Sequence, residues 1–225
     1  GKRQGMKLFV DTADLTEIEE IAGWGVLSGV TTNPSLLAKV EGDADDIYRR
    51  VCELVDGPIS AEVVADGRAE MVTEGRRLAA IHPNIVVKLP MSHEGLAATS
   101  ILASDDIRVN MTLCFTAPQA LLASASGASF VSPFVGRFDD IGQNGIECLR
   151  EVVEALETST YDTEVLAASI RTPVHVTEAA RMGADIATIP PKVFRQMLSH
   201  PLTEAGTATF TKDFAARAAR TGAGA

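Results

Sequence analysis

The sequence lacks the features of a membrane protein and of a nucleic-acid-binding surface. No uninterrupted apolar run reaches the ~18 residues that a membrane span needs, and the first residues lack the hydrophobic core of a signal peptide. Thirty acidic residues stand against twenty basic ones, and the net charge of −10 includes no separate block of like charge. We therefore expect a cytoplasmic protein with neither a membrane nor a nucleic acid as its partner. Any anionic substrate must then be bound by a few local basic residues.

Cysteine and histidine are also scarce, which argues against a disulfide framework and against a metal site. The three cysteines are odd in number, widely spaced and embedded in apolar stretches, as is typical of reduced core thiols. The four histidines share no ligand spacing, and no G-x-G-x-x-G or phosphate-loop pattern occurs. We predict no disulfide, no metal and no cofactor. The residues concerned are Cys52, Cys114, Cys148, His82, His93, His175 and His200.

The chain has the size and composition of one globular domain. Its 225 residues are 46% hydrophobic, with no internal repeat or low-complexity linker, so we predict a single domain over residues 6–225. Residues 1–5 precede Met6, which looks like a natural start. We interpret these five residues as a remnant foreign to the natural chain.

Short apolar, β-branched runs alternate with longer segments of helical periodicity along the whole chain. This alternation, with eight strands, favours an α/β fold of the (β/α)8 or TIM-barrel type over an open doubly wound sheet. Cap residues before several helices, such as Asp14, Asp43 and Ser92, support the assignment. The expected strands are 7–11, 29–32, 59–64, 85–89, 108–114, 129–134, 163–169 and 185–189. The expected helices are 16–22, 44–55, 68–81, 94–103, 118–124, 145–156, 174–182 and 191–198.

An extra C-terminal helix is expected over residues 201–220, beyond what the barrel requires. Phe210, Phe214 and Ala218 recur there at helical spacing. Such a helix either packs on its own barrel or crosses to a neighbouring subunit, and the pattern leaves both arrangements open.

Polar residues end nearly every apolar strand. In a TIM barrel the active site lies at the carboxyl ends of the strands, where these side chains would meet. Taken singly, a strand-end Asp or Asn is more often a helix cap or a turn residue. Together they predict an active site, and the residues are Asp11, Thr31, Thr32, Asn33, Glu62, Lys88, Asn110, Thr112, Ser132 and Ser169.

Lys88 is the most informative of these residues, because it interrupts the apolar run from Ile85 to Leu89. Lysine is seldom buried without a partner or a purpose. One interpretation is a salt bridge to Glu62 or Asp11. The other is a nucleophile, because desolvation favours the neutral amine, which attacks a ketone to form a carbinolamine and then an iminium ion.

This chemistry requires proton carriers and groups that bind hydroxyls. Asp11 and Glu62 come from different strands and can approach the amine from two sides, while Thr112 can hold a water between them. Asn33 and Asn110 can bind substrate hydroxyls. Their alternatives are a turn residue for Asn33 and a buried, backbone-bonded amide for Asn110.

Two arginines follow the late strands, where TIM barrels commonly bind phosphate. Arg137 comes shortly after the sixth strand and Arg171 after the seventh, and guanidinium groups bind phosphate bidentately. A surface salt bridge is the alternative for each. Lys192 could add positive charge, although a solvated lysine is the simpler interpretation.

Four segments carry a resemblance to a known family: 10–14 (VDTAD), 29–35 (GVTTNPS), 86–91 (VVKLPM) and 131–137 (VSPFVGR). They resemble the transaldolase family, in particular its short form related to fructose-6-phosphate aldolase, and the similarity runs from Met6 to about Phe214. The resemblance implies a (β/α)8 barrel that transfers a dihydroxyacetone unit from a ketose phosphate such as fructose 6-phosphate to an aldose phosphate such as erythrose 4-phosphate. It also implies a role in the pentose phosphate pathway and a homo-oligomer built as a ring of barrels.

The same resemblance implies residue roles. Lys88 matches the Schiff-base lysine and Asp11 the acid–base aspartate, while Glu62 and Thr112 match the pair that positions the catalytic water. Thr31, Asn33, Ser132, Ser169, Arg137 and Arg171 match positions that bind substrate hydroxyls and phosphate.

Glu62 and Phe134 favour transfer over simple cleavage. The transferases resemble this chain there, whereas the aldolases carry glutamine and tyrosine. A tyrosine hydroxyl can protonate the bound three-carbon carbanion, and Phe134 has no such proton. The alternatives are an aldolase that releases dihydroxyacetone and, more remotely, a barrel that has lost catalysis and only binds ligands.

Overall fold

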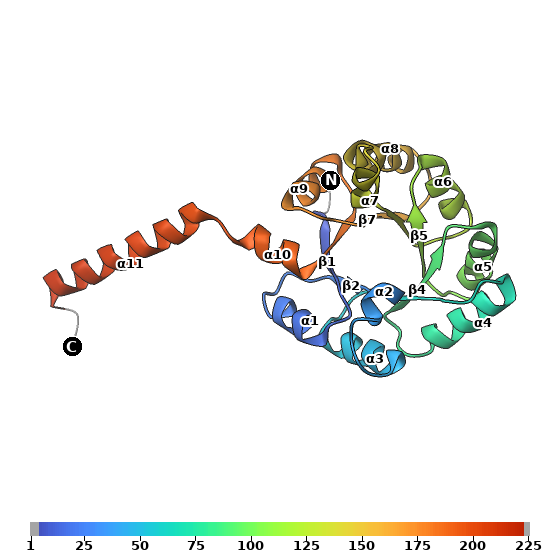
Figure 1. Cartoon of the computed structure of the whole chain (residues 1–225), viewed down its shortest axis with the longest axis horizontal. Helices are drawn as coiled ribbons and strands as arrows, with labels where there is room; N and C mark the ends of the chain where they lie inside the picture. The colour runs from blue at the N-terminus through green and yellow to red at the C-terminus, as the bar shows by residue number, and fades with distance from the viewer. Residues whose placement is uncertain (1–4, 223–225) are drawn as a thin grey trace.

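The computed structural model describes residues 5–222, which form a closed barrel of eight parallel strands surrounded by helices (Figure 1). Each strand pairs with the next along the chain, and the first strand pairs with the last to close the barrel, with Lys7 opposite Ile186. The predicted (β/α)8 fold is therefore confirmed. The strands are β1 (Lys7–Asp11), β2 (Gly29–Thr31), β3 (Ile59–Glu62), β4 (Ile85–Pro90), β5 (Val109–Cys114), β6 (Phe130–Pro133), β7 (Glu164–Ala167) and β8 (Ile186–Ile189).

Helices follow the strands and cover the outside of the barrel. The predicted caps are confirmed, because the side chains of Asp14, Asp43 and Ser92 each accept hydrogen bonds from the first turn of a helix. The helices are α1 (Leu15–Ala22), α2 (Pro34–Leu37), α3 (Ala44–Leu54), α4 (Arg68–Ala79), α5 (His93–Ser104), α6 (Ala117–Ala125), α7 (Val135–Asp140), α8 (Gly145–Glu157), α9 (Pro173–Met182), α10 (Pro191–Leu198) and α11 (Pro201–Thr221).

The structure differs from the sequence-based expectation mainly at two short helices and at the ends of two strands. Strand β3 ends at Glu62, two residues earlier than expected. Helices α2 and α7, which follow β2 and β6, were not expected, since four and six residues are too few to show a periodicity. Strand β7 ends at Ala167, so Ser169 lies beyond it, in a left-handed conformation with φ 54°. The expected remnant, residues 1–5, lies outside the described residues except for Gly5.

Alternate residues of each strand face the barrel interior, and the interior is divided into two levels. The lower level is apolar and contains Phe9, Val86, Phe130, Leu166 and Ile186. A Cβ atom on Gly29 would lie 2.6 Å from the Phe9 ring, so a glycine on β2 makes room for one of the two phenylalanine side chains of this level. Further along the same strands the interior residues become polar, which places the polar level at the carboxyl ends.

The three cysteines are free, as predicted. Cys52 and Cys114 are buried, and burial raises the pKa of each thiol to about 11. Cys148 is only partly buried, so the expectation of a core position is wrong for this residue. Within residues 5–222, no helix combines the length and apolar character needed to cross a membrane.

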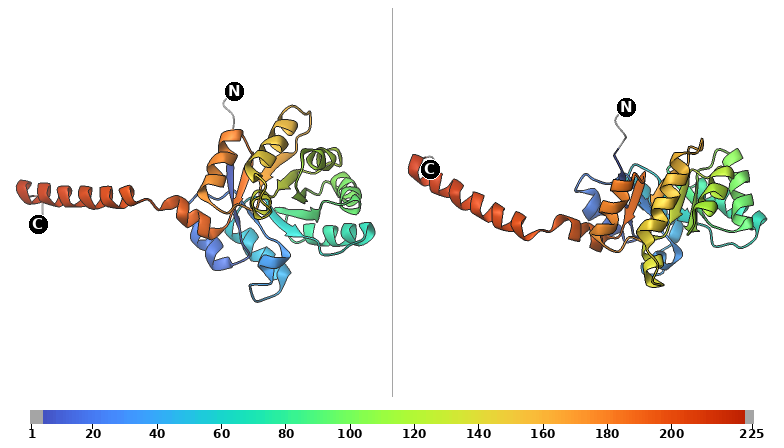
Figure 2. Two further views of the ribbon diagram at one scale, coloured as in Figure 1. Left: turned by 45° about the horizontal axis from the view of Figure 1, so that its top comes forward. Right: turned by 90° about the horizontal axis from the view of Figure 1, so that it is seen from above.

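Helix α11 extends away from the barrel (Figures 1 and 2). None of its described residues is buried, and Leu202, Phe210 and Phe214 are 76%, 75% and 72% exposed. The expectation of a helix over 201–220 is confirmed, and packing on its own barrel is contradicted. Contact with a neighbouring subunit, the other arrangement expected from the sequence, stays a prediction.

Candidate active site

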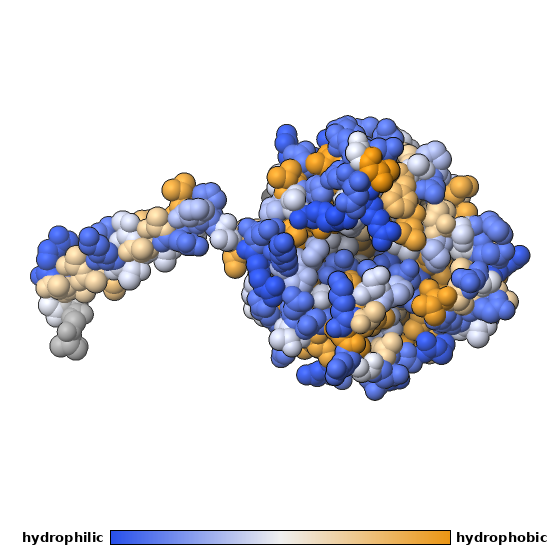
Figure 3. Space-filling model, in the orientation of Figure 1, coloured by the Kyte–Doolittle hydropathy of each residue, from blue (hydrophilic) through white to orange (hydrophobic). Residues whose placement is uncertain are grey.

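A cavity of about 340 Å³ opens at the carboxyl ends of the strands. Hydrophilic residues gather around the centre of this face of the barrel (Figure 3). Nine of the residues predicted from the sequence line this cavity: Asp11, Thr31, Asn33, Lys88, Ser132, Phe134, Arg137, Ser169 and Arg171. A larger cavity, of about 450 Å³, lies at the opposite end beside Val165 and Asp185. We place the site in the first cavity, because it contains the buried lysine.

Lys88 lies on β4 with only 5% of its surface exposed. Its ammonium nitrogen Nζ donates a hydrogen bond to the backbone carbonyl of Thr32 at 3.0 Å. It also forms an ion pair with Glu62 Oε2 at 3.5 Å. The predicted salt bridge to Glu62 is therefore present, but it coexists with a position on the cavity wall, where a substrate can reach the amine.

Asp11 is held by a short chain of hydroxyl groups. The Thr31 hydroxyl donates to Asp11 Oδ1 at 2.8 Å and lies 2.5 Å from the Thr188 hydroxyl. Since Thr31 has one hydroxyl proton and gives it to the carboxylate, Thr188 must be the donor to Thr31. Burial raises the pKa of Asp11, and the positive charge of Lys88 opposes that rise.

Glu62, at the end of β3, is opposite Lys88 in the register of β3 and β4. Burial raises the pKa of Glu62, again against the opposing charge of Lys88. Two carboxyl groups whose pKa values are raised by burial therefore interact with one buried amine. This arrangement suits proton transfer in both directions.

Asn110 and Thr112 lie on the interior face of β5 but do not line the cavity. The Asn110 amide donates to Ser60 Oγ at 3.2 Å and accepts from Ser132 Oγ at 2.6 Å. The expected backbone-bonded amide is thus wrong, because both partners are side chains. Thr112 is 1% exposed, and within the described part of the chain its hydroxyl has no hydrogen-bond partner.

Asn33 is a helix cap, a common role of a strand-end Asn, and not the turn residue of its alternative interpretation. Its Oδ1 accepts a hydrogen bond from Leu36 N at 2.9 Å, at the start of α2. The residue still lines the cavity. Capping places the side chain at the cavity edge, so this role is compatible with binding of a substrate hydroxyl.

The two arginines lie on the same side of the cavity. Arg137, on α7, has its guanidinium carbon 5.1 Å from the centroid of the Phe134 ring. Arg171 makes two hydrogen bonds to Asp140, at 3.0 and 2.8 Å, and these bonds lower the pKa of Asp140. The salt-bridge alternative is therefore realised for Arg171. Because this pair is about half exposed, solvent screens it and a bound anion can replace the carboxylate.

Sequence reasoning missed Lys39, Ser35 and Thr188, all of which line the cavity. Ser35 ends the segment 29–35, which was used only for the family resemblance, and Lys39 follows the four-residue helix α2, which is too short to show a periodicity. Thr188 could have been found, because it is a polar residue two positions after Ile186 on an apolar strand. Lys192 is exposed on α10 and is not part of the cavity wall, which agrees with the interpretation as a solvated lysine.

Comparison with known families and proteins gives a consistent result. Residues 8–223 match the family described as transaldolase/fructose-6-phosphate aldolase. A probable transaldolase of Symbiobacterium thermophilum is 55% identical over 215 residues, which cover 96% of this chain and 100% of that protein. A probable transaldolase of Thermus thermophilus is 58% identical over 218 residues, covering 93% of this chain and 98% of that protein.

Among solved structures, the similarity extends to distant barrels. Thiamine phosphate pyrophosphorylase from Pyrococcus furiosus has a TM-score of 0.58 at 16% identity, covering 84% of this chain and 88% of that one. The carboxyl transferase domain of Rhizobium etli pyruvate carboxylase with 3-bromopyruvate has a TM-score of 0.61 at 11% identity, covering 83% of this chain and 40% of that one. At these identities the likeness concerns the fold alone.

Proposed function

Because the chain belongs to the transaldolase/fructose-6-phosphate aldolase family, we propose that it is a transaldolase that moves a dihydroxyacetone unit between sugar phosphates through a Schiff base on Lys88. The donor is a ketose phosphate such as fructose 6-phosphate or sedoheptulose 7-phosphate. The acceptor is an aldose phosphate such as erythrose 4-phosphate or glyceraldehyde 3-phosphate. The observation that carries the proposal is a buried lysine on the cavity wall whose amine interacts with two carboxyl groups of raised pKa.

The first stage is attack of the Lys88 amine on the ketone carbon of the donor. Its ion pair with Glu62 and its hydrogen bond to the Thr32 carbonyl fix the amine at the cavity wall. Transfer of the ammonium proton to a carboxylate frees the nitrogen lone pair, and addition to the ketone gives a carbinolamine. Protonation of its hydroxyl and loss of water then leave an iminium ion.

The second stage is cleavage of the carbon–carbon bond beside the iminium carbon. Asp11 removes the proton from the hydroxyl on the far carbon of that bond, and its raised pKa suits it to hold the proton. The bonding electrons move to the iminium nitrogen. The aldose leaves as an aldehyde, and a three-carbon enamine remains on Lys88.

The third stage returns the unit to an acceptor. The enamine carbon attacks the new aldehyde, Asp11 gives its proton to the resulting alkoxide, and water hydrolyses the iminium ion. Glu62 and the buried Thr112 hydroxyl are suited to hold this water, since the hydroxyl has no partner within the described residues. The amine of Lys88 is thereby regenerated.

Arg137 and Arg171 are proposed to bind the substrate phosphate, with Ser132, Ser169, Thr31 and Asn33 at the hydroxyl groups. Asn110 contributes through Ser132, to which it is hydrogen-bonded. A charge-assisted hydrogen bond contributes about 1.5–3 kcal/mol. Loss of either guanidinium should therefore weaken the binding of phosphorylated substrates by roughly tenfold or more.

Borohydride trapping tests the covalent step. During turnover of fructose 6-phosphate, reduction should fix a three-carbon adduct on Lys88, located by peptide mass spectrometry, and Lys88→Ala should abolish it. Lys39→Ala is the matched control, because Lys39 also lines the cavity and should be dispensable for the adduct. An adduct on Lys39 or Lys192 would overturn the proposal.

The aldolase alternative depends on Phe134, which has no proton to give to the enamine. The parent protein should release little dihydroxyacetone from fructose 6-phosphate alone and should transfer it when erythrose 4-phosphate is added. Phe134→Tyr introduces a general acid, which typically contributes about 10²–10⁴-fold, so release without an acceptor should rise. Equal rates of release and transfer in the parent would identify an aldolase. If the parent showed neither release nor transfer, the alternative of a barrel that only binds ligands would be favoured.

A homo-oligomer is proposed from α11. Leu202, Phe210 and Phe214 recur at multiples of four along a helix that its own barrel does not cover. A second copy of the chain is the natural partner for such a stripe. Truncation after Leu198 should lower the number of subunits per particle, obtained by dividing the light-scattering mass by the mass of one chain, whereas Glu204→Gln on the same helix should not. An unchanged number of subunits after truncation would exclude this role for the helix.

A further inference from the structure

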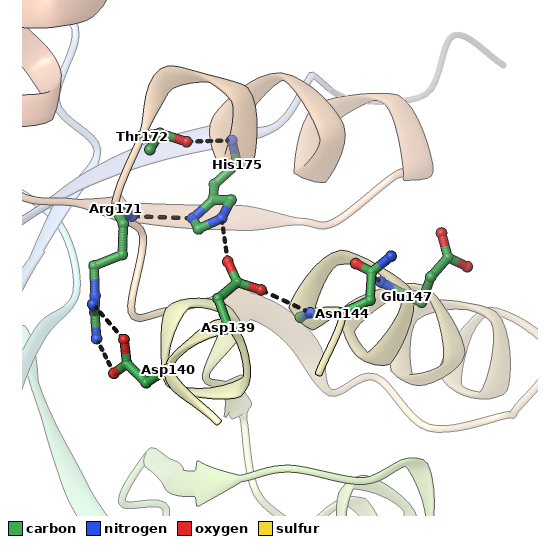
Figure 4. Close-up of polar contacts among 8 residues, drawn as sticks. Asp139, Asp140, Asn144, Glu147, Arg171, Thr172 and His175 are labelled. Atoms are coloured by element: carbon green, nitrogen blue, oxygen red, sulfur yellow. Dashed lines mark hydrogen bonds and ion pairs between the residues drawn. The ribbon is translucent and has the colours of Figure 1, made fainter. Parts of the chain in front are cut away.

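Two neighbouring carboxylates at the end of α7 hold different parts of Arg171 (Figure 4). Asp140 binds the guanidinium directly. Asp139 reaches the backbone of the same arginine through His175, whose Nε2 lies 2.9 Å from Asp139 Oδ2. The other ring nitrogen, Nδ1, accepts a hydrogen bond from Arg171 N at 3.1 Å. The histidine thus connects α7 to the loop that carries the arginine.

The direction of these hydrogen bonds follows from the backbone amide. Arg171 N–H can only donate, so Nδ1 of His175 must present its lone pair. The ring proton then lies on Nε2 and is donated to Asp139. The second oxygen of Asp139 accepts from Gly145 N at 3.0 Å, at the start of α8. Each group in this network has one defined role as donor or acceptor.

The network is largely buried at its centre, and it holds the backbone of the loop beyond the last backbone hydrogen bond to α7. The His175 side chain is 8% exposed. The loop after β7 is attached to α7 by two backbone bonds, Val135 N to Ala168 O at 2.9 Å and Gly136 N to Ser169 O at 2.8 Å. Gly136 permits this approach, because a Cβ there would lie 2.4 Å from Ser169 O. The bond from Arg171 N to His175 extends the attachment to the arginine itself.

We propose that His175 is a positioning residue for anion recognition, which fixes the Arg171 backbone relative to the helix that carries Arg137. The inference rests on the proposed binding of a substrate phosphate by these two arginines. A bidentate guanidinium contact needs a fixed distance and orientation, so a brace on the loop lowers the freedom that binding must remove. A histidine supplies the brace because its two nitrogens face opposite ways, one toward the loop and one toward α7.

Two substitutions separate the two hydrogen bonds. In His175→Asn the amide oxygen occupies the place of Nδ1 and keeps the acceptor for Arg171. In His175→Gln the amide nitrogen occupies the place of Nε2 and keeps the bond to Asp139 but loses that acceptor. Loss of one hydrogen bond corresponds to a change of roughly three- to tenfold. We therefore expect His175→Gln to raise KM for fructose 6-phosphate and the inhibition constant of inorganic phosphate by that factor, and His175→Asn to raise both less.

The controls distinguish positioning from general damage. KM for unphosphorylated fructose with glyceraldehyde as acceptor, and kcat with either donor, should stay within about twofold, less than the loss of one hydrogen bond. Equal increases in KM for both donors, or equal effects of the two substitutions, would overturn the inference. The variant Arg171→Gln distinguishes failure of this inference from failure of the proposed phosphate site. If it leaves phosphate inhibition unchanged, the phosphate site is wrong; if it weakens inhibition while both His175 variants do not, only the inference fails.

A measurement on the unaltered protein covers the case in which the variants do not fold. Nitrogen-15 NMR of the histidine rings reports which nitrogen carries the proton. His175, assigned by its absence in His175→Asn or by its coupling to neighbouring protons, should show a proton on Nε2 and a lone pair on Nδ1. A proton on Nδ1 would contradict the hydrogen bond from Arg171 and with it the proposed brace.

Discussion

The two interior levels of the barrel are built from the same strands but have opposite character. Phe9 and Val86 belong to the apolar level, and Asp11 and Lys88, two residues further along β1 and β4, belong to the polar one. Packing of apolar side chains stabilises the lower level. In the upper level, burial raises the pKa of the Asp11 and Glu62 carboxyl groups, so ionisation of these groups opposes folding. The comparison indicates that packing in one level stabilises the barrel, while the chemistry that we propose belongs to the other level.

The sharpest test is Asp11→Asn in the polar level. Removal of a positioned acid–base group should lower kcat by about 10²–10⁴-fold. Stability should respond in the opposite sense. Because the folded-state pKa of Asp11 is raised, its contribution to stability is present below the unfolded pKa and is lost as pH rises through the folded value. Asparagine does not ionise, so the variant should gain stability relative to the parent as pH rises from ~4 toward neutrality.

Urea unfolding at several pH values, beside steady-state rates, measures both effects. Thr177→Val on the exposed side of α9 serves as the control, and its stability difference from the parent should not depend on pH. If the free energy of unfolding of Asp11→Asn falls relative to that of the parent as pH rises, the separation of the two levels is wrong.

The apolar level is tested by Phe9→Ala. Deletion of a buried phenylalanine side chain typically costs about 3–5 kcal/mol, through lost burial and the cavity that remains. The free energy of unfolding should fall by that amount. The rate per folded molecule should change little at temperatures below the transition, because Phe9 lies below the cavity and does not line it. If Phe9→Ala lost as much rate as Asp11→Asn, the two levels would not be functionally separate.

The smallest effect is expected for Asp140→Asn at the rim of the polar level. The pair with Arg171 is about half exposed, and such pairs contribute little. Freeing the guanidinium should lower KM for fructose 6-phosphate by less than about fivefold and leave stability nearly unchanged. Asp105→Asn, which frees Arg76 far from the cavity, is the control for general charge effects. A higher KM in Asp140→Asn would show that the carboxylate orients Arg171 more than it competes for it.

The sequence predicted the barrel and most of the cavity wall because both depend on local patterns. Strand and helix periodicity repeats eight times, and a lysine within an apolar strand such as β4 is distinctive. The network around His175 could not be predicted, since its partners come from α7, α8 and the loop after β7. Which side chains form hydrogen bonds between such distant elements depends on how the helices pack. The spacing of residues along the sequence does not reveal these pairs. The role of Asn110 was ambiguous for the same reason, because its partners Ser60 and Ser132 come from other strands.

Closure of the barrel between β1 and β8 has a consequence for the order of folding during synthesis. Lys7 pairs with Ile186, so the first strand waits for nearly the whole barrel to be made. At about 5–20 residues per second, this interval lasts roughly 10–40 s, during which one edge of β1 has no partner strand. We expect ribosome-bound chains that end before β8 to be digested readily by added protease, and chains that expose β8 to resist it. Protection of the shorter chains would contradict this order.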